Sequence, residues 1–102
     1  MSLESARAQA EDVRRQLNTQ LTQYLASLAA AQTSLEIAEA SRAASEEDLR
    51  VQRERYRLGA ATIVDVLASQ VNLDQAEVDI VRARFDYLVA KAQIEALVGR
   101  EL

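Results

Sequence analysis

The side chains that could do chemistry in this chain are carboxylates and guanidinium groups, because it contains no histidine and no cysteine. Asp65, Asp79 and Asp86 are spaced by multiples of seven residues, so on a helix they form one acidic stripe. Such groups attract ions and charged partners, but they supply neither an activated nucleophile nor a thiolate or imidazole metal ligand. We therefore expect no enzyme, no metal and no cofactor.

A second charged group lies just before the segment that interrupts the helical pattern. Its members are Arg50, Arg53, Arg55 and Arg57. Cations at this place complement the C-terminus of a helix and pair with Glu46, Glu47 and Glu54. Binding of a partner is the other interpretation, and the sequence leaves it open.

The interrupting segment itself predicts a tight reversal. Gly59, one of two glycines in a chain without proline, fits the left-handed position just past a helix end. Thr62 followed by Asp65 three residues later is a capping box, which starts a new helix. The same Asp65 carboxylate is thus a candidate for capping as well as for the acidic stripe.

These signals predict helices over about 3–58 and 63–98, joined by a tip at 59–62, with Gly99 as a second C-cap. So short a connection forces the helices antiparallel. The fold class is all-α, a single long helical hairpin of the coiled-coil type. The first helix overshoots the second by roughly 30 Å at 1.5 Å per residue, which leaves residues 1–22 without a partner in the hairpin.

Apolar residues of the first helix follow a heptad seam with a polar lapse at Arg42 and Ser45. The seam consists of Leu17, Leu21, Tyr24, Leu28, Ala31, Leu35, Ala38, Leu49 and Tyr56. A weaker second line runs through Ala30, Ile37, Ala44, Val51 and Leu58.

The second helix has two apolar faces on nearly opposite sides. One contains Val66, Leu73, Ile80, Tyr87 and Ile94, flanked by the small residues Ser69, Ala76, Ala83 and Ala90. The other contains Val64, Val71, Val78, Phe85 and Ala92, flanked by Leu67, Val81 and Leu88. Two polar stripes separate them: a mixed-charge stripe of Gln70, Glu77, Arg84 and Lys91, and the acidic stripe, which also includes Asn72 and Gln93.

A simple two-helix hairpin needs only one apolar stripe, so two opposed faces indicate a neighbour on each side. A closed α-helical barrel and a four-helix bundle of dimerised hairpins both satisfy this pattern. Net charge −4 argues against a nucleic-acid partner, and no apolar run reaches the roughly 20 residues of a membrane span. Met1-Ser2-Leu3 looks like an expression start, and we expect an excised segment of a larger protein.

The tip and the second helix resemble the TolC-like outer membrane efflux protein family. The resemblance is carried by Glu54-Arg55-Tyr56-Arg57-Leu58-Gly59-Ala60-Ala61-Thr62-Ile63-Val64-Asp65-Val66-Leu67, by Ala83-Arg84-Phe85-Asp86-Tyr87-Leu88-Val89 and by Ala96-Leu97-Val98-Gly99. It implies the second periplasmic hairpin of a homotrimeric Gram-negative outer membrane channel, within an α-helical barrel that exports small molecules or proteins. A periplasmic adaptor would dock at the hairpin tips and link the channel to an inner-membrane transporter.

The resemblance also implies roles for individual residues. The adaptor-docking tip would comprise Tyr56, Arg57, Leu58, Gly59, Ala60, Ala61 and Thr62, and the pore lining would include Asp65, Asp79 and Asp86. Ala61 and Ala68 stand where some relatives carry the side chains that gate the channel entrance. This chain lacks those side chains, so we do not expect it to gate in the same way. The rival interpretation is a structural coiled-coil hairpin, such as that of the adaptor itself, which needs neither the Tyr-x-x-Gly tip nor a second apolar face.

Overall fold

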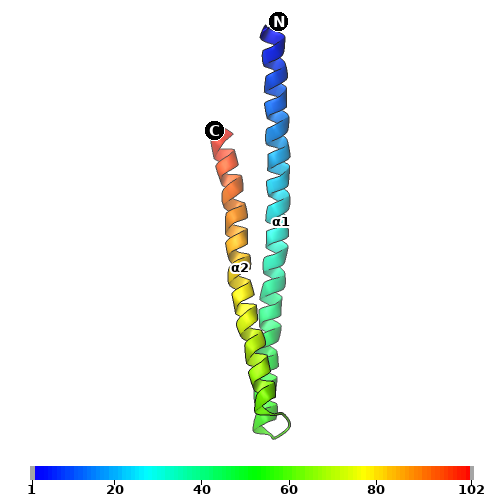
Figure 1. Cartoon of the computed structure of the whole chain (residues 1–102), viewed down its shortest axis with the longest axis vertical. Coiled ribbons are helices and arrows are strands. Elements are labelled where there is room, and N and C mark those ends of the chain that lie inside the picture. The colour runs from blue at the N-terminus through cyan, green and yellow to red at the C-terminus, as the bar shows by residue number, and fades with distance from the viewer. Residues whose placement is uncertain (1, 102) are drawn as a thin grey trace.

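The chain folds into two long helices that lie side by side and antiparallel (Figure 1). The computed structural model describes residues 2–101, of which α1 spans Ser2–Arg57 and α2 spans Ile63–Glu101. The hairpin measures 85 × 17 × 14 Å along its principal axes. Abundant Ala, Leu, Glu, Arg and Gln, with no proline, favour unbroken helices of this length. The predicted fold class, an all-α antiparallel hairpin, is confirmed.

The end of α2 differs from the sequence prediction. Gly59 is the one glycine with positive φ in residues 2–101, so Gly99 is not a C-cap, and α2 continues through it. A glycine inside a helix costs only about 1 kcal/mol, and residues 100 and 101 provide no breaker to stop the helix.

The two helices meet along the predicted seam. Its most buried members are the small or aliphatic residues Ala38, Leu49, Ala76, Ile80, Ala83, Ala90 and Leu97. Ser69 is also buried in this seam, with 4% of its surface exposed. Its hydroxyl donates a hydrogen bond to the Asp48 carboxylate of α1, so this buried polar group has a partner. Both helices contribute small and large side chains to this seam: Ala38 and Leu35 of α1 pack against Ile80 and Ala83 of α2.

Tyr56 does not continue the seam, contrary to the sequence prediction. Its side chain is 48% exposed, and Gln52 is the last partly buried residue of α1. The reason is its position: Tyr56 lies opposite the reversal, before the first partly buried residue of α2, Val66. The first residues of α2, Ile63, Val64 and Asp65, are themselves exposed and do not cover the ring.

The start of α1 extends beyond the end of α2 (Figure 1). Every residue over 2–16 is exposed, whereas Leu17 and Leu21 are partly buried. The uncovered stretch is shorter than predicted, because α2 reaches Glu101 rather than ending near Val98. Neither helix of residues 2–101 contains a segment apolar enough to cross a membrane.

The two glycines provide a matched test of the backbone at the tip. A Cβ added at either position meets no atom within 4 Å, so Gly59→Ala and Gly99→Ala differ only in backbone conformation. We expect Gly59→Ala to lower the free energy of unfolding by about 1 kcal/mol, because φ is +78° there. Gly99→Ala should raise it by up to about 0.8 kcal/mol.

Urea unfolding followed by circular dichroism at the helix band measures both changes. Equal effects of the two substitutions would contradict the assignment of Gly59 as an obligatory left-handed residue.

Candidate functional site: the tip and its two grooves

The reversal is closed by backbone hydrogen bonds at the end of α1. The Ala60 N–H donates to the Arg55 carbonyl at 2.7 Å, and the Gly59 N–H donates to the Tyr56 carbonyl at 3.0 Å. With Gly59 at φ +78°, this is a Schellman motif. The Arg55 guanidinium adds a bond to the Ala60 carbonyl at 3.2 Å. The tip is therefore held by its own backbone and one arginine.

The capping box at the start of α2 forms as the sequence predicts. The Thr62 N–H donates to the Asp65 carboxylate at 2.9 Å, and the Asp65 N–H donates to the Thr62 hydroxyl at 3.3 Å. The backbone hydrogen bond from Thr62 is the main reason that the pKa of Asp65 lies below its ordinary value; the Thr62 side chain and the charge of Arg55 act in the same direction. Asp65 is thus engaged in holding the tip.

The outer surface of the tip is apolar. Leu58 and Val64 are each 67% exposed, and Tyr56 and Ile63 are about half exposed. Gly59, Ala60 and Thr62 are exposed between them, while Ala61 is partly buried. The Schellman motif and the capping box thus present exposed apolar side chains from both helix ends around the reversal.

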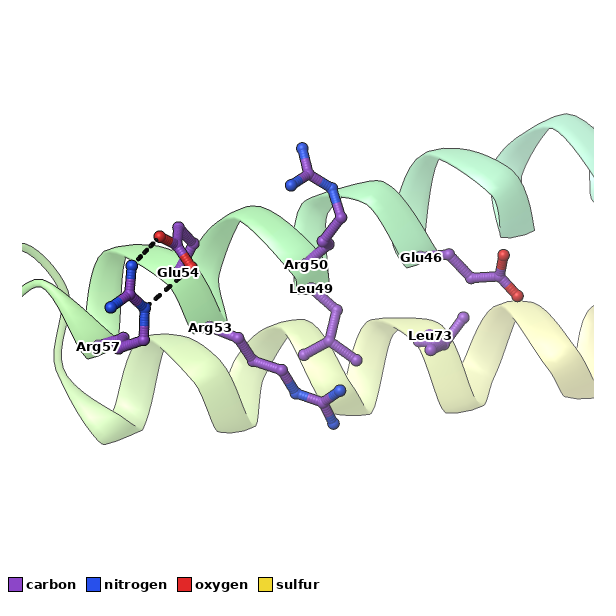
Figure 2. Close-up of a pocket in the computed structure, with 7 residues that line it drawn as sticks. All are labelled: Glu46, Leu49, Arg50, Arg53, Glu54, Arg57 and Leu73. Carbon is purple, nitrogen blue, oxygen red and sulfur yellow. Dashed lines mark hydrogen bonds and ion pairs between the residues drawn. The ribbon is translucent and has the colours of Figure 1, made fainter.

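A groove near the tip contains three of the four arginines, Arg50, Arg53 and Arg57 (Figure 2). It is lined by Glu46, Leu49, Arg50, Arg53, Glu54, Arg57 and Leu73. Arg50 pairs with Glu47 at 2.6 Å and Arg57 pairs with Glu54, so the predicted pairing with these two glutamates is confirmed. Glu46 pairs instead with Arg42, at 3.3 Å.

Arg53 is the arginine that crosses to the other helix. Its guanidinium donates to the Gln70 side-chain oxygen of α2 at 3.3 Å. This side of the hairpin therefore joins the mixed-charge stripe of α2 to the arginines of α1.

The opposite side of the hairpin carries the other groove, which is acidic. Asp79 and Asp86 line it together with Ser34, Ser41 and Arg82, in a hollow of about 350 Å³. The Asp79 carboxylate also accepts a hydrogen bond from Gln75 at 3.0 Å. The structure thus brings Asp79 and Asp86 into one groove, whereas Asp65 does not line it.

Two cross-helix contacts were not foreseen from the sequence: Ser69 with Asp48, and Arg53 with Gln70. Both residues of each pair lie on or beside the seam. Knowing the exact register of α1 against α2 would therefore have predicted these contacts. No group of three potential metal-ligating side chains occurs in the part of the chain that the structure describes.

The cap carboxylate makes stability depend on acid pH. Hydrogen bonds from Thr62, Arg50 and Arg57 hold the pKa values of Asp65, Glu47 and Glu54 below their ordinary values. A carboxylate with a lowered folded pKa stabilises the fold above its unfolded pKa and loses that contribution as pH falls through the folded pKa. We expect the urea midpoint to be constant from neutral pH down to about pH 4.5 and to fall below it.

Asp65→Asn isolates the contribution of the cap. The variant should be less stable than the parent chain at pH 7, and the two urea midpoints should converge at acid pH, where the parent carboxyl is protonated. Parallel midpoints across the whole pH range would contradict a charged cap.

Comparison with known proteins adds a family to this geometry. Residues 1–100 match the outer membrane efflux protein family, which covers nearly the whole hairpin. Searches of curated proteins and of solved structures gave no match. The match spans both helices, the Schellman reversal and the capping box, and a family that covers this much of the chain fixes its membership. The chain belongs to the outer membrane efflux protein family.

Proposed function

We propose that this hairpin is part of the periplasmic α-helical barrel of an outer membrane efflux channel, and that its tip docks a periplasmic adaptor. Family membership supports a channel-type transport protein rather than an enzyme. The observation that carries the docking role is the exposed apolar tip on a rigid backbone. Function at an exposed loop on a stiff scaffold is common, because the scaffold keeps the contact surface in place.

The tip suits an interface in its composition. Tyr56, Leu58, Ile63 and Val64 are 48–67% exposed in a segment where the backbone N–H groups of residues 58–60 and 62 are already hydrogen-bonded. A partner that covers these side chains gains apolar burial and pays little entropy for ordering the loop. Arg57 borders this surface with its charge already paired to Glu54. The partner we infer is the hairpin tip of a periplasmic adaptor, which links the channel to an inner-membrane transporter.

The barrel role is supported by the second apolar faces of both helices. Val71, Val78 and Phe85 of α2 are more than half exposed, as is Ile37 of α1. In a homotrimeric barrel these faces meet neighbouring helices, and the hydrophilic grooves face the pore or the periplasm. We assign the groove of Asp79 and Asp86 to the pore, with Asp65 near the entrance. Exported small molecules or proteins would pass along it.

The rival function, a structural hairpin such as that of the adaptor, has less support. It accounts for the antiparallel seam, but it requires no second apolar face on α2, and the family match is to efflux channels.

Leu58→Asp tests docking against a closely matched control. Leu58 is 67% exposed at the tip, and Leu3 is 66% exposed at the far end of α1. In the full-length channel, Leu58→Asp should reduce cross-linking to the cognate adaptor at least about tenfold, because a charge enters an apolar contact. Leu3→Asp should leave it unchanged. Equal cross-linking by the two variants, both inserted in the outer membrane, would exclude the tip as the docking surface.

Asp79→Asn tests the pore assignment. Its control is Glu77→Gln, which removes a charge from the mixed-charge stripe on the other side of the hairpin. In planar bilayers the full-length Asp79→Asn channel should lose part of its cation selectivity, while Glu77→Gln should keep it. If Glu77→Gln alters selectivity and Asp79→Asn does not, the opposite groove lines the pore.

A further inference from the structure

The face of α2 that points away from α1 has no partner within the chain. We call it the outer face of α2, and it consists of Val64, Leu67, Val71, Val78, Val81, Phe85 and Leu88. Each of these seven side chains is 52–67% exposed. They follow a 3/4 heptad spacing over more than six helical turns, the pattern of a second coiled-coil seam, with one polar interruption at Asp74 between Val71 and Val78.

We propose that in the isolated 102-residue chain a second copy covers this face, with the two α2 helices antiparallel and a two-fold axis passing between Asp79 and Ile80. In this register Val78 lies against the partner's Val81, and Val71 lies against the partner's Leu88. The dimer is a four-helix assembly with the α2 helices at its centre.

The outer face is large enough for such a dimer. Burying seven aliphatic and aromatic side chains removes roughly 100 Å² each from water, or roughly 700 Å² per chain. A standard stable interface buries about 800 Å² per partner. Because the helix is already formed by packing on α1, association orders no further backbone.

Charges beside the outer face select the antiparallel register. The mixed-charge stripe borders this face with Glu77 in its first half and Arg84 and Lys91 in its second, and all three side chains are exposed. None of them belongs to an ion pair among the described residues. In the proposed register Glu77 lies beside the partner's Arg84, and by symmetry the pair forms twice.

The hairpin itself provides the precedent for this contact. Arg53 and Gln70 flank the α1–α2 seam in the same way, and their side chains reach each other at 3.3 Å. Residues beside an antiparallel seam are therefore within hydrogen-bonding range in this protein.

Neighbouring registers are disfavoured by the same charges. A shift of one heptad in one direction places Arg84 beside the partner's Arg84, and a shift in the other places Glu77 beside the partner's Glu77. Asp74 lies within the outer face, at the same heptad position as Leu67 and Val81, and in the proposed register it lies against the partner's Phe85. Gln70 donates a hydrogen bond to it at 3.0 Å, so its charge is partly satisfied within its own chain.

This inference concerns the chain by itself and does not depend on the channel role. Failure to dimerise would leave the family membership and the docking assay untouched. In an intact channel, under the function proposed above, the outer face would meet a different helix.

Charge exchange tests the register by sedimentation equilibrium of the 102-residue chain. The parent should be a dimer. Glu77→Arg and Arg84→Glu should each weaken it roughly tenfold, since two attractive pairs become repulsive. The double variant E77R/R84E should recover the parent affinity. A monomeric parent, or a double variant weaker than both single variants, would overturn the proposal.

Disulfide trapping tests the same register independently. Because the chain has no cysteine of its own, any disulfide must involve the introduced residues. Val71→Cys and Leu88→Cys chains, mixed and oxidised, should form a cross-linked heterodimer, because these positions face each other. Neither variant should cross-link alone, because equivalent positions are 17 residues out of register, or roughly 25 Å. Cross-linking of either variant with itself, in preference to the mixture, would show a parallel or different packing.

Val78→Glu separates association from folding. It places a charge at the centre of the dimer and should leave a monomer that is as helical as the parent. Its control is Ile37→Glu, an even more exposed position on the second line of α1, which should remain dimeric. If Ile37→Glu disrupts the dimer and Val78→Glu does not, the interface lies on α1 and the proposal fails.

Discussion

The reversal from Leu58 to Thr62 is the constraint on which the whole hairpin depends. With only a few residues between the helices, the phase in which α1 ends determines which face of α2 turns toward it. The Schellman bonds fix that phase on one side and the capping box fixes it on the other. All seam contacts, from Ser69 with Asp48 to Leu97 near Tyr24, follow from this local geometry.

Local chemistry explains why the tip was predictable from the sequence. The glycine, the Thr62–Asp65 pair and the heptad spacing act over a few residues, so their types and separations are sufficient to predict them. Gly99 failed as a predicted cap because a glycine alone does not end a helix when no competing hydrogen bonds form. Tyr56 matched the heptad spacing but lies beside the reversal, where the first residues of α2 are themselves exposed. Heptad spacing indicates on which face of a helix a residue lies, but it does not indicate whether another helix covers that residue.

The two sides of the hairpin differ in the kind of charge that they present. Beside the tip, Arg50 and Arg57 are neutralised by glutamates three residues away on the same helix. The opposite groove is lined by two carboxylates, Asp79 and Asp86, and by a single cation, Arg82. The assignment of these aspartates to one groove needed the antiparallel register, whereas the capping role of Asp65 needed only its immediate neighbours.

The tight tip also has a consequence for the order of folding. Contacts near the reversal join residues about 20 positions apart, such as Asp48 and Ser69, whereas those at the open end join residues about 70 apart. Closing the far contacts first would cost more chain entropy than closing the near ones. The helices therefore pair from the tip toward the open end, each layer shortening the loop that the next must close. We therefore expect a destabilising substitution at Gly59 to slow folding and one at Leu17 chiefly to speed unfolding.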